Sequence, residues 1–161
     1  GCIRAGHIQI SGMAQGKNVV ITIAVKIEDS QVRTMLSGIQ ERANNLTPAM
    51  RLIGQIVRNS VLKNFMEGGR PGKWRPSKRA MQGGKTLVDT ARLQNSITAK
   101  AFSDRAEVGT NVVYAAIHQF GGKAGRGHKV NIPARPFLMV QPEDWTEINA
   151  ALADYLLKGA K

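Results

Sequence analysis

The sequence is poor in cysteine and in acidic residues, and it has no long apolar run. Cys2 is the only cysteine, so no disulfide can form within one chain, as suits assembly in a reducing cytoplasm. No apolar stretch approaches the roughly 20 residues that a membrane span needs, so we expect no membrane contact. Only 11 Asp plus Glu stand against 23 Lys plus Arg, which gives a net charge of +12. Such a charge attracts polyanions or acidic protein surfaces, but it does not define a fold.

Groups of residues that carry out chemistry are also missing. His118 is the best candidate for a general base, yet no nucleophile or orienting carboxylate stands beside it. We therefore interpret it as a histidine with satisfied hydrogen bonds at the edge of the core or in a subunit contact. His7, His118 and His128 lack companions at zinc-ligand spacing, and the glycines of 68–84 form no phosphate-binding loop. The sequence predicts no enzymatic activity, no metal site and no cofactor.

The length of 161 residues and the hydrophobic content of 42% fit one globular domain. Met13 is followed by a polar run, and we expect it to be the natural start. Residues 1–12 are then a non-native leader, and residues 13–161 form a single domain. Ile8-Gln-Ile10 nevertheless has the composition of a short strand.

The first half of the domain predicts one strand and two helices. Residues 19–27 are rich in β-branched side chains and read as a strand. Apolar residues then recur at helical spacing. Asp29 or Ser30 is expected to cap the N-terminus of the first helix, and Thr47-Pro48 to begin the second. Gly68-Gly69 ends the second helix. The expected apolar stripes are Val32, Leu36, Ile39, Ala43 and Leu46, and then Met50, Ile53, Val57, Val61 and Phe65.

The second half predicts shorter elements. We expect a short helix over 87–93, a hairpin over 96–108 and a short buried helix over 112–120. A last helix begins near Pro142, and Trp145, Ile148, Leu152, Tyr155 and Leu156 line one of its faces. The fold class is therefore α+β, with a small, largely antiparallel sheet packed against two or three amphipathic helices, and with long basic loops.

Two loops, 68–85 and 121–129, carry bases without acids and are expected to be exposed and mobile. They could dock on a neighbouring subunit with Trp74 as the anchor, bind nucleic acid, or remain solvated. We favour docking, and we expect loss of Trp74 to cost the core little. Arg135 between two prolines suits a subunit contact or a bond within the domain. The predicted contact residues are Arg70, Lys73, Trp74, Arg75, Lys78, Arg79, Lys85, Lys123, Arg126, Lys129 and Arg135.

The most informative motif lies at 108–138. Tyr114-Ala-Ala-Ile-His-Gln-Phe-Gly-Gly122 ends on paired glycines, and Ile132-Pro-Ala-Arg-Pro-Phe-Leu138 must be extended because of its two prolines. Together they resemble the signature of the phage virion morphogenesis family, the tail-completion proteins of Mu-like phages. Gly72-Lys-Trp-Arg-Pro-Ser77 and residues 86–97 are similar to two further family segments, except that Ala91 replaces a usual glycine. The motif residues are Tyr114, His118, Phe120, Gly121, Gly122, Pro133, Pro136 and Phe137.

The resemblance implies a structural protein of the virion, assembled in the cytoplasm of the bacterial host. It would act in tail completion or head–tail joining, as a homo-oligomeric ring. Its partners would be the tail tube, neck or head connector, with possible non-specific contact with DNA. The alternative that charge alone supports is a basic nucleic-acid-binding protein.

Overall fold

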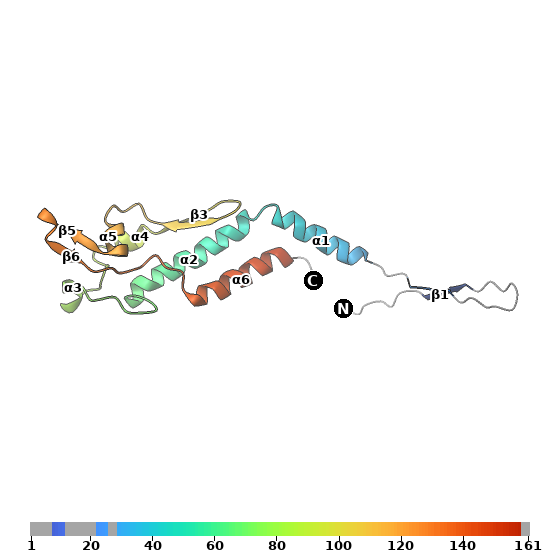
Figure 1. The fold of residues 1–161 in the computed structure, drawn as a ribbon, viewed down its shortest axis with the longest axis horizontal. Helices are drawn as coiled ribbons and strands as arrows, with labels where there is room; N and C mark the ends of the chain where they lie inside the picture. The colour runs from blue at the N-terminus through green and yellow to red at the C-terminus, as the bar shows by residue number, and fades with distance from the viewer. Residues whose placement is uncertain (1–7, 12–21, 26–28, 159–161) are drawn as a thin grey trace.

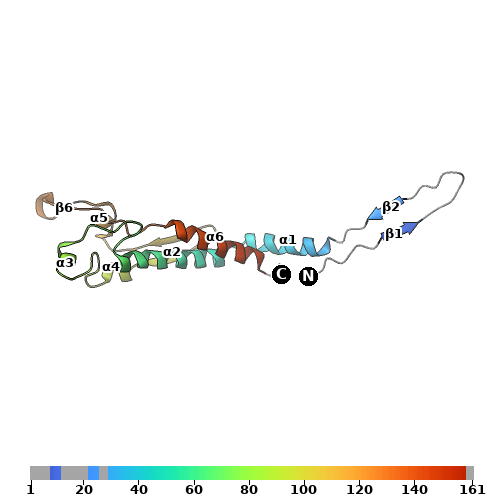
Figure 2. The same ribbon diagram turned by 90° about the horizontal axis from the view of Figure 1, so that it is seen from below.

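The computed structural model describes residues 8–11, 22–25 and 29–158. The molecule is elongated, with two long helices side by side at its centre (Figure 1). A first helix and a β-ribbon extend to one end, and the short helices and the last hairpin lie at the other (Figure 2). The predicted α+β class is confirmed.

The helices in the described residues are α1 Ser30–Ala43, α2 Thr47–Glu67, α3 Lys78–Met81, α4 Arg92–Asn95, α5 Ala115–Phe120 and α6 Pro142–Leu157, with a 3₁₀ turn, η1, at Arg126–His128. The strands form three separate antiparallel pairs. These are β1 Ile8–Ser11 with β2 Thr22–Val25, β3 Thr98–Ala101 with β4 Ala106–Gly109, and β5 Gly122–Ala124 with β6 Val130–Ile132.

The predicted N-terminal strand is present over Thr22–Val25, where Thr22 pairs with Ser11 and Val25 with Ile8. Residues 19–21 and 26–27 of that prediction lie outside the described residues. The short strand expected at Ile8–Ile10 is observed as β1. Whether residues 1–12 are native stays open.

Helix α2 supplies the core residues Val61 and Phe65. Pro48 lies in its first turn, and Gly68 ends it with a left-handed φ of 72°. The predicted cap is displaced by one residue, because Leu46 takes the N-cap position and Thr47 is already helical. Helix α6 and the β3–β4 hairpin pack against α2. The hairpin can approach α2 closely because Gly54 has no side chain. An added Cβ at Gly54 would lie only 3.3 Å from the Ala99 Cβ.

Helix α1 forms where its periodicity predicts, but its apolar stripe is not covered. None of its residues is buried, and Val32 and Leu36 remain 53% and 55% exposed. Its tertiary contacts are with α6, through bonds such as that from Arg42 Nε to Leu156 O at 2.7 Å. The first half of the stripe is therefore uncovered in the described chain, whereas Ile39, nearer the end of the helix, is half-buried.

The helix predicted over 87–93 is wrong. Leu87 and Ala91 have left-handed φ values of 61° and 57°, which no α-helix accommodates. A turn closed by a bridge between Lys85 and Val88 occupies the segment instead, and α4 begins only at Arg92. The departure from the family motif falls at this point, because Ala91 stands in a conformation that glycine adopts more easily.

We expect Ala91→Gly to stabilise the protein. A residue with a Cβ loses about 1 kcal/mol in the left-handed region, and glycine removes that loss at the price of a more flexible unfolded chain. The net gain in the free energy of unfolding should be a few tenths of a kcal/mol up to about 1 kcal/mol. Urea denaturation followed by circular dichroism measures it. Lower stability of the Ala91→Gly protein would show that the turn needs the methyl group.

Two further expectations need correction. Residues 121–129 are not a structureless loop, since they contain β5 and η1 and lead into β6. Helix α5 is present, but it is not buried as a whole. Ala115 is its buried residue, whereas Phe120 is 79% exposed.

The core lies between α2, the start of α4 and the segment after β6. Phe65 meets Phe137 at a ring-centroid distance of 5.2 Å and Trp74, edge to face, at 5.8 Å. The remaining buried members of this cluster are Val61, Leu93, Ile97, Val112 and Ala115.

Candidate functional site

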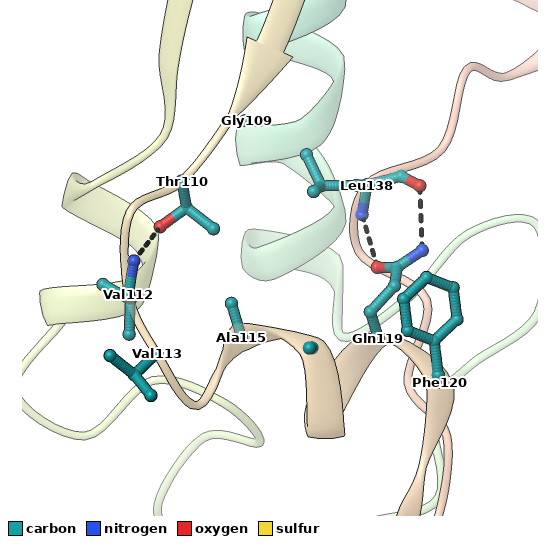
Figure 3. Close-up of a pocket in the computed structure, with 9 residues that line it drawn as sticks. Gly109, Thr110, Val112, Val113, Ala115, Gln119, Phe120 and Leu138 are labelled. Carbon is teal, nitrogen blue, oxygen red and sulfur yellow. Dashed lines mark hydrogen bonds between the residues drawn. The ribbon is translucent and has the colours of Figure 1, made fainter.

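The two halves of the sequence motif meet in space, where the Pro133–Leu138 segment runs beside α5. Arg135 N–H donates to the His118 carbonyl at 2.7 Å. The Gln119 side chain accepts from the backbone N–H groups of Phe137 and Leu138 at 2.9 and 3.0 Å, and donates to the Leu138 carbonyl at 3.0 Å (Figure 3). One glutamine therefore satisfies three backbone groups of an extended segment that has no strand partner there.

Gly121 makes this close approach possible. Its φ is 74°, and an added Cβ would lie 2.7 Å from the backbone nitrogen of Ala134. Any side chain would push the extended segment away from α5. Gly122 also has a positive φ, of 144°, but an added Cβ there meets only the Ile117 side chain at 3.8 Å.

The extended segment also reaches the core. Phe137 is fully buried, and its carbonyl accepts a hydrogen bond from Asn64 Nδ2 at 2.9 Å. Trp74 Nε1 donates to the Pro136 carbonyl at 3.1 Å. The expectation that Trp74 is an exposed docking anchor is wrong, since its side chain is 8% exposed and packs on Phe65.

Four predicted contact bases form hydrogen bonds within the described chain: Arg135, whose Nε donates to the Arg75 carbonyl at 2.9 Å, and three bases of the 68–85 loop. Arg70 donates to Asn64 Oδ1 at 2.9 Å, to both oxygens of Ser60, and to Glu143 at 3.0 Å. Lys73 Nζ donates to the Glu67 carbonyl at 2.6 Å. Arg79 binds the Asp89 carboxylate and the Val88 carbonyl. Arg70 in particular is a structural residue, because its side chain is mostly buried.

The other bases of the two loops are exposed and form no hydrogen bond or ion pair through their side chains in the described part of the chain. Their role in a subunit or polyanion contact stays a prediction. They are Arg75, Lys78, Lys85, Lys123, Arg126 and Lys129.

His118 lies at the edge of the core, but its hydrogen bonds are not satisfied as expected. Its Nδ1 atom is buried and has no partner among the described residues. Its ring meets Tyr114 edge to face at 5.8 Å. Burial, and then the positive charge of Arg135, lower the pKa of His118 below its ordinary value, so the ring is neutral at pH 7.

A basic cavity of about 400 Å³ opens between residues 77–93 and α5. His118, Tyr114 and Arg135 line it from one side, and Arg79, Lys85, Asp89 and Arg92 from the other. No sequence pattern indicates this cavity, because its walls come from segments that are distant along the chain.

A second hollow, of about 470 Å³, lies on the other side of α5 (Figure 3). Val112, Ala115 and Leu138 line it, with the exposed Val113 and Phe120 at its edges. The predicted motif residue Phe120 therefore belongs to an accessible apolar surface, whereas Phe137 belongs to the core.

Sequence reasoning missed the polar residues that hold the site together. Ser60 and Asn64 are buried on α2, one helical turn apart, next to Val61 and Phe65. Polar residues at core spacing were the available signal, since a buried amide needs hydrogen-bond partners. Gln119 and Gln141 carried no comparable signal.

Within the described ranges 8–11, 22–25 and 29–158, a metal site would need ligating side chains that lie close together, and a membrane span would need a long apolar helix. No three His, Cys, Asp or Glu side chains gather there to hold a metal ion. No helix in those ranges combines the length and apolar character that crossing a bilayer requires.

Residues 27–157 match the model of the phage virion morphogenesis family, and the chain belongs to that family. It is similar to the Mu-like prophage FluMu G protein 2 of Haemophilus influenzae, with 44% identity over 134 residues, which cover 83% of this chain and 95% of that protein. No solved structure matches the chain. The resemblance read from residues 108–138 is thereby confirmed.

Proposed function

We propose that this protein is a structural subunit of a tailed phage or prophage that acts in tail completion or head–tail joining, as part of a homo-oligomeric ring. Family membership and the similarity to a Mu-like prophage protein support the virion role. The observation that supports assembly is helix α1, which exposes Val32 and Leu36 of its apolar stripe although its length and periodicity are those of a packed helix.

A ring of identical subunits needs two different surfaces on each subunit, one that inserts and one that receives. Helix α1 extends away from α2 toward the β-ribbon (Figure 1). Val32, Met35 and Leu36 are exposed on it. A groove of about 280 Å³ between α2, β4 and residues 138–140 has only apolar residues along it, including Ile53, Val57 and Val108. We assign α1 as the inserting surface and this groove as the receiving surface of the next subunit.

The alternative, a nucleic-acid-binding protein, has lost one of its supports. Trp74 is buried against Phe65 and cannot stack on a base. The exposed bases remain and would give salt-sensitive, sequence-independent binding.

The test replaces Val32 and Leu36 by glutamate. We expect a folded monomer, because no residue of α1 is buried, and we expect loss of oligomers, because two charges would have to enter an apolar contact. Each contact should weaken by about 2 kcal/mol or more. Light scattering and electron microscopy report assembly, and complementation of a phage that lacks the gene reports function.

Thr34→Glu with Ser37→Glu is the matched control, since it places the same charge on the opposite face of α1. That control should assemble like the unaltered protein. Normal rings and normal phage titres from the Val32 and Leu36 double variant would show that α1 is not part of the interface between subunits. If the wild-type protein stays monomeric at all concentrations and in the particle, the proposal that it forms a ring is wrong.

A further inference from the structure

The basic cavity contains an arginine that lacks its natural partner. Arg135 is 6% exposed, and its Nε donates to the Arg75 carbonyl at 2.9 Å. No carboxylate forms an ion pair with Arg135 in the part of the chain that the structure describes, and its two terminal nitrogens make no hydrogen bond there. These terminal nitrogens are not among the buried side-chain atoms that lack a partner in the described residues, so they keep contact with solvent and can donate to an anion that enters the cavity.

The surroundings of Arg135 are arranged for an anion. Burial, and then the nearby charge of Arg75, lower the pKa of Arg135, which means that the free protein holds this cation at a cost. Lys85 and Arg92 add positive charge to the same cavity. The carboxylate of Asp89, on the same wall, is already bound by Arg79. His118 also lines the cavity, and its buried Nδ1 atom has no hydrogen-bond partner among the described residues.

We propose that this cavity is a binding site for a carboxylate side chain, a glutamate or aspartate of a neighbouring protein subunit, with Arg135 as the principal ligand and His118 as a second donor. A carboxylate takes two parallel hydrogen bonds from the two terminal nitrogens of a guanidinium. Nδ1 of neutral His118 donates when it carries the ring proton. The identity of the protein that supplies the carboxylate rests on the proposed role in virion assembly. The chemistry of the site does not depend on that role.

A carboxylate fits better than a DNA phosphate. A side chain that ends in a carboxylate is narrow and reaches a group that is almost wholly buried. A duplex phosphate is fixed between two sugars on a wide helix, and it suits exposed bases such as Lys123 and Arg126. A second copy of the chain offers Glu41, Glu147 and Asp154, which form no ion pair in the described residues. Another virion protein is the other source.

Binding is tested with a short peptide that has one central glutamate, and with the same peptide carrying glutamine. Nuclear magnetic resonance of the full chain follows the side-chain nitrogens of His118 and Arg135. We expect saturable shifts with the glutamate peptide only. Arg135→Met should weaken binding about tenfold or more, since it removes a charge-assisted pair. Arg126→Met, which removes the same charge from an exposed position, should change it less than about twofold.

Stability separates a ligand site from a purely internal role. Arg135→Met should leave the free energy of unfolding unchanged or higher, because methionine fills a similar space without a buried charge. Equal shifts with both peptides, or unchanged binding by the Arg135→Met protein, would each overturn the proposal. If Arg135→Met fails to fold, Lys85→Gln with Arg92→Gln must still weaken glutamate binding.

Further variants identify the source of the carboxylate. If the unaltered protein forms oligomers and the Glu41→Gln, Glu147→Gln or Asp154→Gln protein does not, the carboxylate belongs to a second copy of this chain. Intact oligomers from all three, together with failed complementation by Arg135→Met, place it on another virion protein. Peptide binding does not require assembly, so a negative peptide result leaves the ring proposal standing.

Discussion

Replacement of Trp74 by alanine is expected to lower the free energy of unfolding by about 3 to 5 kcal/mol, as for other buried tryptophans. The indole is 8% exposed, it packs on Phe65, and its Nε1 holds the Pro136 carbonyl. Alanine would leave a cavity between α2 and the Pro133–Leu138 segment, and it would leave that carbonyl without its donor. Urea denaturation followed by circular dichroism at 222 nm would measure the change.

Trp145→Ala is the matched control, because it removes the same side chain from a position on α6 that is 56% exposed. Its effect on the monomer should stay below about 1 kcal/mol. Equal stability losses in the two variants, or a Trp74→Ala protein as stable as the wild type, would place Trp74 outside the core after all.

Arg70→Ala is expected to cost about 3 kcal/mol of stability, the second-largest effect. The guanidinium satisfies Asn64, which is fully buried, and both oxygens of Ser60, and it is paired with Glu143 on α6. Removing it leaves buried polar atoms unpaired, each at a cost of about 1 to 3 kcal/mol, which water that enters the gap would partly offset. The pair with Glu143 is exposed on the carboxylate side and contributes little.

Arg51→Ala serves as the control for Arg70. Arg51 is an exposed arginine on α2, the helix that carries Ser60 and Asn64, so its replacement should shift stability by no more than about 0.5 kcal/mol. Thermal unfolding of both variants compares them directly. If the Arg70→Ala and Arg51→Ala proteins have the same melting temperature, the hydrogen bonds of Arg70 with Asn64 and Ser60 do not stabilise the fold. Arg70 would then again be a candidate contact residue.

Trp74 and Arg70 show why the loop over 68–85 was misjudged from sequence. Both stand among glycines, prolines and bases, and a local window reports the polarity of such a segment but not its path. The path is set at Gly69, whose φ of 109° turns the chain back, and Trp74 N–H then donates to the Gly68 carbonyl at 2.7 Å. An added Cβ at Gly69 would lie 2.7 Å from Trp74 Cδ1, so the turn and the buried indole depend on each other.

The sequence by itself determined the elements whose cause is local. The apolar spacing fixed α1 and α2, Gly68 fixed where α2 ends, and Pro142 with Asp144 fixed the start of α6. Alternation around Ser103–Arg105 determined the β3–β4 hairpin. The motif at 108–138 determined the family. These features depend on backbone preferences and periodicity, which neighbours in the chain are enough to set.

Only the tertiary structure decided which side chains are free. It buried Trp74 and Arg70, left the stripe of α1 exposed, and brought His118 and Arg135 into one cavity with Lys85 and Arg92. It also gave Ala91 a left-handed backbone that its sequence neighbours do not announce. Burial and pairing depend on contacts between residues far apart in sequence. An arginine side chain can therefore bind buried polar groups at one position of the chain and be an exposed charge at another.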